Sequence, residues 1–289
     1  MPPRLHSVQC LHSGGLHRMA YAEWGERDNP EVVVCVHGLS RNGRDFDTLA
    51  RALAATHRVI CPDIVGRGLS DHLPDHRGYV FPQYVADCIT LFARLDVERL
   101  SWVGTSMGGL IGMMIAAMVG HPISRLVIND VGPVIGREGI ARIGQAVGTR
   151  TEFDSFEEGM AYVMKAAASF GPHTPEQWRL LSEHTVLPRD GKWKLHYDPR
   201  IGDATRAALA DDRVGADLWP MWDRIRIPTL VLRGAQSDLL EEPVARAMTE
   251  RGPKASLITY PGVGHAPALL QPEQVADVVS FINERRNPA

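Results

Sequence analysis

The stretch Leu100–Val119 constrains the fold of this chain more than any other. A short apolar run ends at Gly104, small residues follow, and a long apolar run then continues. The pentapeptide Gly104–Gly108 fits the pattern G-x-S-x-G, which describes a tight turn from a strand into a helix. Glycines at both ends remove the Cβ atoms that would clash across such a turn, so the hydroxyl of Ser106 is left free above the sheet. The pattern therefore predicts that Ser106 is a nucleophile.

The composition is that of an ordinary globular chain. Its 289 residues are 44% hydrophobic and 22% charged, enough for one large core with an inserted subdomain. The formal net charge is −3 and no Lys/Arg-rich run occurs, which argues against a nucleic-acid partner. The longest apolar run, Leu110–Val119, is shorter than the about 20 residues that span a bilayer, and the N-terminus lacks the apolar segment of a secretory signal. We therefore expect a cytoplasmic protein without a membrane partner.

Neither a metal nor an organic cofactor is expected. The turn Asp63–Ser70 is rich in glycine, but a polar loop follows it and not the helix that a dinucleotide site requires. His72 and His76 lie in that loop with Pro74 between them, which excludes the helical geometry of a paired metal site. The four cysteines form no C-x-x-C pair, and most lie in or beside apolar stretches, as is typical of buried thiols in a reducing compartment. They are Cys10, Cys35, Cys61 and Cys88.

Strands and helices alternate along most of the chain. A hairpin that turns at Gly14-Gly15 is predicted near the N-terminus. The β-branched run Glu31–His37 is typical of a strand buried on both faces of a parallel sheet. The alternation predicts an α/β fold with a mostly parallel, doubly wound sheet.

The alternation of strands and helices stops between residues 133 and 219. Helices are predicted at Gly139–Val147, Ser155–Ala168 and Pro175–His184, and no strong strand pattern interrupts them. We therefore expect a core of residues 1–132 and 220–289, with a helical insertion, residues 133–219, between two strands of its sheet.

A serine hydroxyl needs a general base, itself oriented by a third group, to act as a nucleophile at neutral pH. His265 lies in a Gly-rich loop after the last predicted strand and is the candidate base. Asp238 lies just past the predicted strand Thr229–Arg233 and is the candidate acid. The chain order Ser106, Asp238, His265 is the one expected for a nucleophile on this kind of turn.

These residues resemble the α/β-hydrolase superfamily of serine esterases and lipases. The resemblance is carried by Val36–Leu39, the turn Asp63–Ser70, the Gly104–Gly108 turn, the two aspartates Asp130 and Asp238, and Gly264-His265. It runs from near residue 30 to near residue 285, and the insertion occupies the place of that family's cap. The resemblance implies an oxyanion hole made by the backbone N–H groups of Leu39 and Met107.

The resemblance also leaves a second candidate for the acid. Members of the superfamily can take it from the strand after the nucleophile helix, which here would be Asp130. The Asn-Asp-Val-Gly-Pro setting of Asp130 more often shapes the start of the cap, so Asp238 is preferred. His37 is expected to support the oxyanion loop through hydrogen bonds, and Asp63 to cap its own turn.

Arg41 and Arg44 follow the oxyanion turn and have two interpretations. They are either ordinary surface charges or forked donors that bind a substrate carboxylate.

The sequence therefore predicts a serine hydrolase that cleaves carboxylic esters of small molecules through an acyl-enzyme. A lactonase, a hydroxyalkanoate-oligomer hydrolase and a carbon–carbon bond hydrolase are alternatives on the same residues. A serine at position 106 argues against a haloalkane dehalogenase, which needs a carboxylate there. A ligand receptor on the same fold is the alternative outside enzymes, and an intact triad argues against it. The acyl pocket and the choice between monomer and homo-oligomer stay open.

Overall fold

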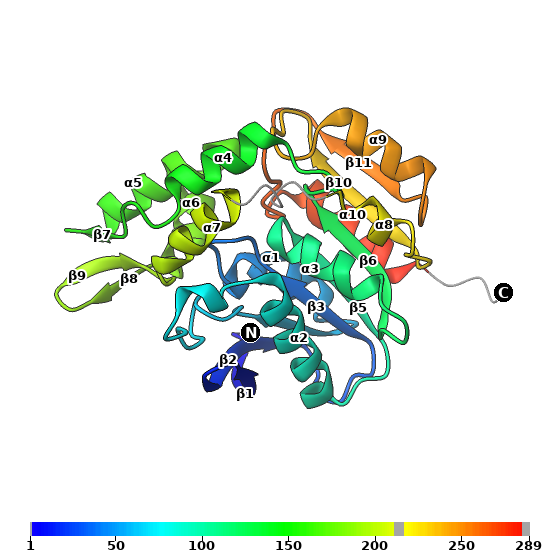
Figure 1. Ribbon diagram of the computed structural model, residues 1–289, viewed down its shortest axis with the longest axis horizontal. Helices are drawn as coiled ribbons and strands as arrows, with labels where there is room; N and C mark the ends of the chain where they lie inside the picture. Colours follow the sequence, from blue (N-terminus) through cyan, green and yellow to red (C-terminus); the bar gives the residue numbers. More distant parts are fainter. Residues whose placement is uncertain (1, 211–216, 285–289) are drawn as a thin grey trace.

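The computed structural model describes residues 2–210 and 217–284, and an eight-stranded sheet forms its centre (Figure 1). The strands lie in the order β1-β2-β4-β3-β5-β6-β10-β11. The β1–β2 and β2–β4 pairs are antiparallel, and every other neighbouring pair is parallel, so the expected mostly parallel sheet is confirmed. The strands are β1 (Arg4–His12), β2 (Gly15–Trp24), β3 (Val32–Val36), β4 (Arg58–Pro62), β5 (Leu100–Thr105), β6 (Ile123–Asn129), β10 (Thr229–Gly234) and β11 (Ser256–Tyr260).

Helices cover both faces of the sheet, because successive side chains of the central strands point to opposite faces and both sets are apolar. In β3, Val34 and Val36 belong to one apolar cluster, whereas Val33 and Cys35 belong to the cluster on the opposite face. The first cluster packs against α2 (Phe81–Leu95), α3 (Met107–Ala116), α8 (Trp219–Trp222) and α9 (Glu242–Glu250). The second packs against α1 (Asp47–Leu53) and α10 (Pro272–Asn283). A strand buried on both sides must be apolar throughout, which accounts for the continuous β-branched run.

The segment between β6 and α8 forms a separate group of elements, seen at the upper left of Figure 1. Helices α4, α5 and α6 lie close to the predicted positions, whereas α7 was not predicted. Thr174 and Gln177 form a capping box at the start of α6. The prediction of no strand in this segment was wrong, because β7, β9 and β8 form a small antiparallel sheet. The elements are α4 (Arg137–Ala146), β7 (Glu152–Phe153), α5 (Phe156–Ala166), η3 (Ala168–Phe170), α6 (Pro175–Glu183), β8 (Val186–Arg189), β9 (Lys192–Leu195) and α7 (Arg200–Ala210).

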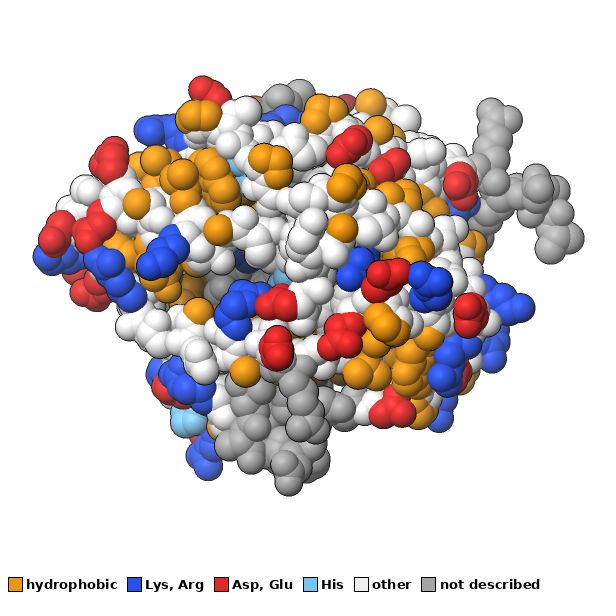
Figure 2. Space-filling view, turned by 90° about the horizontal axis from the view of Figure 1, so that it is seen from above, with side chains coloured by type: hydrophobic (Ala, Val, Ile, Leu, Met, Phe, Trp, Pro, Cys, Tyr) orange, Lys and Arg blue, Asp and Glu red, His pale blue; other side chains and the backbone are white. Residues whose placement is uncertain are grey.

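The face seen from above carries acidic and basic side chains side by side, with hydrophobic side chains between them (Figure 2). This face therefore has no large patch of one sign, in keeping with the small net charge. Within residues 2–210 and 217–284, no helix combines the length and the apolar character that a bilayer crossing needs.

Candidate active site

The site is built on the turn that joins β5 to α3. Ser106 has φ 51° and ψ −112°, a strained conformation for a residue with a side chain. A Cβ on Gly104 would lie 2.2 Å from the carbonyl oxygen of Gly108, and a Cβ on Gly108 would lie 2.0 Å from that of Val36. Only glycine fits at either end, so the two glycines of the sequence pattern are required by the packing of the turn.

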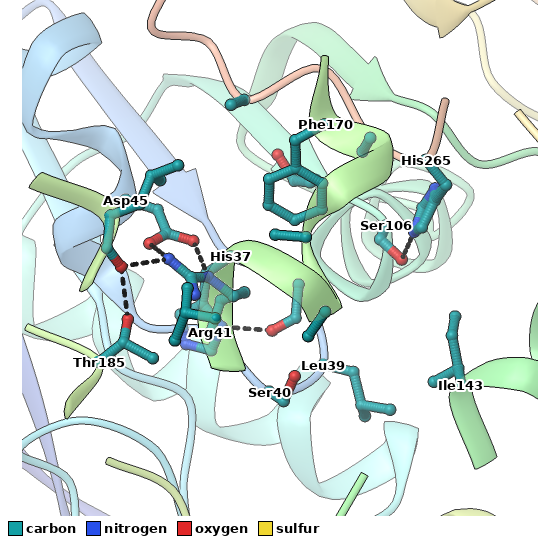
Figure 3. Close-up of a pocket in the computed structure, with 18 of the residues that line it drawn as sticks. His37, Leu39, Ser40, Arg41, Asp45, Ser106, Ile143, Phe170, Thr185 and His265 are labelled. Atoms are coloured by element: carbon teal, nitrogen blue, oxygen red, sulfur yellow. Dashed lines mark hydrogen bonds and ion pairs between the residues drawn. The ribbon is translucent and has the colours of Figure 1, made fainter. Parts of the chain in front are cut away.

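The strained turn aims Ser106 at His265, and the two side chains point toward one another in Figure 3. His265 Nε2 lies 3.0 Å from Ser106 Oγ, and His265 Nδ1 lies 2.8 Å from Asp130 Oδ2. The His265 side chain is only 10% exposed and that of Asp130 is fully buried. A serine, an imidazole and a buried carboxylate are thus joined in one chain of hydrogen bonds, the arrangement that activates a serine hydroxyl.

The structure does not bring Asp238, the preferred acid, to the imidazole. Both oxygens of Asp238 accept hydrogen bonds of 2.9 Å from Arg142 of α4. That pairing lowers the pKa of Asp238. The carboxylate is 37% exposed, unlike the fully buried group that faces His265. Asp130, the alternative acid, occupies the expected place.

Asp130 is held by groups from the end of β10. Its Oδ1 accepts a hydrogen bond from the Gly234 N–H at 2.8 Å, and its Oδ2 accepts one from Ser237 Oγ at 2.6 Å. Together with the imidazole, these donors satisfy a buried charge that would otherwise be costly. Ser237 was not singled out by the sequence, and its position directly before Asp238 is the signal that could have found it.

His37 supports the loop that precedes the proposed oxyanion donors, as the sequence predicts. Its Nδ1 lies 2.7 Å from the carbonyl oxygen of Gly38, and its Nε2 accepts a hydrogen bond of 3.0 Å from the Ile64 N–H. The ring is therefore a neutral tautomer with the proton on Nδ1. Complete burial lowers the pKa of His37 to about 3, so the ring holds the loop without carrying charge.

Asp63 caps its own turn, also as predicted. It accepts hydrogen bonds from the N–H groups of Leu69, at 2.8 Å, and of Gly43, at 2.7 Å. The second of these ties the turn Asp63–Ser70 to the segment that follows the oxyanion loop. Burial raises the pKa of Asp63 to about 6.

A cavity of about 170 Å³ opens over Ser106, between the sheet and the inserted segment. Most of the side chains that wall it from the insertion are apolar: Ile143, Ala146, Val147, Tyr162, Val163, Ala166, Ala167, Phe170, Leu181, Leu195 and Tyr197. Apolar walls of this kind suit a short aliphatic chain.

Arg41 lines this cavity, but its positive charge is already paired with a carboxylate of the protein. Its Nε and Nη2 donate to Asp45 at 2.7 and 2.6 Å, and Nη2 also donates to the carbonyl oxygen of Leu181 (Figure 3). Arg44 is paired with Asp47 and does not line the cavity. The geometry supports ordinary ion pairs at both arginines over a substrate clamp.

Within residues 2–210 and 217–284, one group of side chains has ligand atoms suited to a metal. Cys10, His17 and Asp87 are buried between the β1–β2 hairpin and α2, with one ligand atom of each within 4.8 Å of the others. Asp87 already accepts hydrogen bonds from His17 Nε2, at 3.0 Å, and Gln83 Nε2, at 2.7 Å. These contacts give the group a role in packing the hairpin onto the helix.

The comparisons with known proteins agree with this geometry. Residues 33–278 match the model of the alpha/beta hydrolase family. A 3-hydroxybutyrate-oligomer hydrolase from Cupriavidus necator is 49% identical over 285 residues, which cover 96% of this chain and 97% of that protein. Esterase YbfF from Escherichia coli is 25% identical over 89% of this chain and 94% of its own length.

Among solved structures, an alpha/beta hydrolase from Novosphingobium aromaticivorans is similar with a TM-score of 0.84 and 32% identity, covering 97% of this chain and 98% of that one. These relatives cleave esters or are named hydrolases, and none of the three is named as a receptor. The chain is an ester-cleaving hydrolase, and it belongs to the alpha/beta hydrolase family.

Proposed function

We propose that this enzyme cleaves short linear oligomers of 3-hydroxybutyrate, with Ser106, His265 and Asp130 as its catalytic triad. The observation that carries the mechanism is the chain of hydrogen bonds from Ser106 Oγ through the imidazole to the buried carboxylate. The observation that supports the substrate is 49% identity, over nearly the full length of both chains, to a hydrolase of that name.

In the first half of the reaction, Ser106 Oγ attacks the ester carbonyl while His265 Nε2 takes the hydroxyl proton. The N–H groups of Leu39 and Met107 are the proposed donors to the oxyanion that forms. Met107 is the first residue of α3, where a helix leaves its backbone N–H without an acceptor in the helix. Collapse of the tetrahedral intermediate breaks the ester bond, and His265 returns the proton to the departing 3-hydroxyl oxygen.

In the second half, a water molecule takes the place of the departed alcohol. His265 removes one of its protons, and the resulting hydroxide attacks the acyl carbon bonded to Ser106 Oγ. Collapse breaks the bond to Ser106 Oγ, which takes the proton back from His265, and releases the acid, so each cycle consumes one water and gives one alcohol and one acid. Asp130 keeps the Nδ1 proton of His265 in place throughout.

The insertion is proposed to act as a cap that shapes the acyl site. Its residues provide most of the apolar wall of the cavity, whose about 170 Å³ suits a short chain such as the four-carbon unit of 3-hydroxybutyrate. The four cysteines are unpaired and buried, which supports the proposed cytoplasmic location.

Two assays test the catalytic nucleophile and the substrate independently of each other. Hydrolysis of p-nitrophenyl butyrate is expected to fall by at least about 10³ in Ser106→Ala, and undiminished turnover would contradict the nucleophile. The 3-hydroxybutyrate dimer and trimer are then offered to the wild-type enzyme, and released monomer is measured by chromatography. Turnover of the nitrophenyl ester without release of monomer would keep the triad and reject the oligomer substrate.

A further inference from the structure

The Gly-rich turn Asp63–Ser70 holds a buried charge that the mechanism above does not use. Arg67 is 0% exposed, and among the residues that the structure describes its side chain hydrogen-bonds to no carboxylate. A buried guanidinium is costly unless its donors are matched, so its surroundings must account for it.

Arg67 contacts both residues proposed to form the oxyanion hole. Its Nε donates to the carbonyl oxygen of Leu39 at 2.8 Å, and its Nη2 lies 3.5 Å from Met107 Sδ. Its Nη1 donates to the carbonyl oxygen of Val65 at 2.7 Å. The central carbon of its guanidinium lies over the ring of Tyr84, 4.9 Å from the ring centroid.

The contact with Leu39 completes a clamp on the oxyanion loop. The carbonyl of Gly38 is fixed by His37 Nδ1, at 2.7 Å, and by the Arg41 N–H, at 3.2 Å. N–H and C=O point in opposite directions across a trans peptide, so the Leu39 N–H points away from the His37 ring. Arg67 fixes the next peptide through the Leu39 carbonyl, so the backbone of Leu39 is held on both sides.

The turn that carries Arg67 is itself rigidly placed. Gly68 has φ +54°, and a Cβ there would lie 2.2 Å from Asp63 Oδ2. The Gly68 N–H donates to the carbonyl oxygen of His196 at 2.8 Å, and the Asp198 N–H donates to that of Gly66 at 2.7 Å. The insertion is therefore hydrogen-bonded to the backbone on both sides of Arg67.

We propose that Arg67 is a positioning residue for the oxyanion hole: it fixes the Leu39 peptide, and its positive charge favours the oxyanion over the neutral ester. The inference rests on the proposed function, because it requires Leu39 and Met107 to serve the oxyanion. A charge held in a dry site acts more strongly than one in water, and it needs no reorganisation during the reaction.

The test compares Arg67→Met, Arg67→Lys and a control, Arg125→Met, by steady-state kinetics on p-nitrophenyl butyrate. Arg125 is 6% exposed and lies over the ring of Phe281, at the start of β6 and so at the opposite end of the sheet from Ser106. We expect kcat to fall about 10- to 100-fold in Arg67→Met, with KM within about threefold, because small displacements of a catalytic donor have effects of this size. Arg67→Lys keeps the charge but not the forked geometry, and it is expected to lose less. Arg125→Met should keep its kcat.

Inhibition by butylboronic acid distinguishes a role in the oxyanion hole from a general loss of structure. Its boron bonds to Ser106 Oγ and becomes tetrahedral and anionic, while the hydroxyl proton passes to His265. The inhibition constant is expected to rise in Arg67→Met by about the factor lost in kcat/KM. Thermal melting shows whether each variant is folded at the assay temperature, and if Arg67→Met is unfolded, the same comparison is made with Arg67→Lys.

Two results would overturn the inference: an unchanged kcat in a folded Arg67 variant, or a lower kcat with unchanged boronic acid binding. Ser106→Ala serves as the separate check on the proposed function. If that variant keeps its activity, the proposed site itself is rejected. If it is inactive while the Arg67 variants are unaffected, only the role of Arg67 is rejected.

Discussion

Asp130 and Asp238 follow neighbouring strands of the sheet, β6 and β10, but only Asp130 bonds to His265. Replacing Asp130 with Asn should lower kcat by about 10⁴, because an amide favours the wrong imidazole tautomer. Asp238→Asn removes only a half-exposed ion pair with Arg142, so kcat should stay within a few fold. Steady-state hydrolysis of p-nitrophenyl butyrate by both variants checks the assignment. A large loss in Asp238→Asn with an active Asp130→Asn would reverse it.

The sequence could locate the serine and the histidine but could not choose between these aspartates. Parallel neighbouring strands end at the same edge of the sheet, so a carboxylate after either strand can lie near the same imidazole. What separates them is burial and the donors from Gly234 and Ser237, which depend on how the loop after β10 closes. The conformation of that loop depends on tertiary contacts, so no local sequence pattern predicts it.

His37 makes stability depend on pH in a defined direction. Its folded pKa, about 3, lies below its ordinary value of 6.5, so the unfolded chain binds the proton more tightly. The stabilisation is complete above about pH 6.5 and is lost as the pH falls toward 3. We expect the melting temperature to fall more steeply between pH 6.5 and 4 in the wild type than in His37→Asn.

This comparison isolates His37 from other groups that titrate nearby. The carboxyl of Asp63 has a raised pKa of about 6, so its effect has the opposite sign between pH 3.8 and 6. It is present in both proteins and cancels in the difference of slopes. Parallel slopes in the two proteins would show that His37 is not held neutral.

At the scale of single elements, the β5–α3 turn should tolerate no side chain at its ends. Gly104→Ala would place a Cβ 2.2 Å from a backbone oxygen, which only a shift of strand or helix can relieve. We expect a loss of more than about 4 kcal/mol in the free energy of unfolding, or failure to fold. Gly120→Ala is the matched control, because that glycine has φ +76° but nothing within 4 Å, and it should cost about 1–2 kcal/mol. Equal losses measured by urea unfolding would contradict the packing argument.

The β1–β2 hairpin is attached to α2 through Asp87. Its carboxylate is fully buried and bonded to His17 and Gln83, so Asp87→Ala leaves the buried His17 Nε2 without its acceptor. The expected cost in the free energy of unfolding is about 3–5 kcal/mol. The exposed pair Glu242–Arg246 provides the contrast, and Glu242→Gln should change stability by no more than about 0.5 kcal/mol. A small effect at Asp87 in urea unfolding would mean that the hairpin adds little to stability.

The regular elements of the core follow from the sequence, whereas those of the insertion do so only in part. The hairpin and the strands Val32–Val36 and Thr229–Gly234 lie close to their predicted positions, because a Gly-Gly turn and continuous apolar runs mark them in the sequence. Strands β7, β8 and β9 have only two to four residues, and β8 contains Pro188, a residue that disfavours strands. Runs this short carry too few alternations to be recognised without their partners.

For the whole molecule, residues of both the core and the insertion line the cavity over Ser106. The insertion should therefore determine which length of acyl chain the enzyme prefers. Phe170 of η3 lies among the cavity residues near Ser106 and His265 in Figure 3. Phe170→Ala should enlarge the acyl site, and kcat/KM for p-nitrophenyl octanoate should rise relative to the acetate. Ile143→Ala, on α4, provides a second position in the same wall. An unchanged ratio of octanoate to acetate in both variants would show that the acyl chain lies elsewhere.

The short helix η3 of the insertion is hydrogen-bonded to the loop that carries His265, the proposed catalytic base. The Gly264 N–H donates to the carbonyl oxygen of Ser169 at 2.6 Å, and Ser169 Oγ donates to the carbonyl oxygen of His265. Any outward swing of the insertion that keeps these bonds must carry the imidazole away from Ser106. The imidazole would then lie within reach of Ser106 only while the insertion is closed. Proton transfer between His265 and Ser106 would stop whenever the insertion opens to exchange product for substrate.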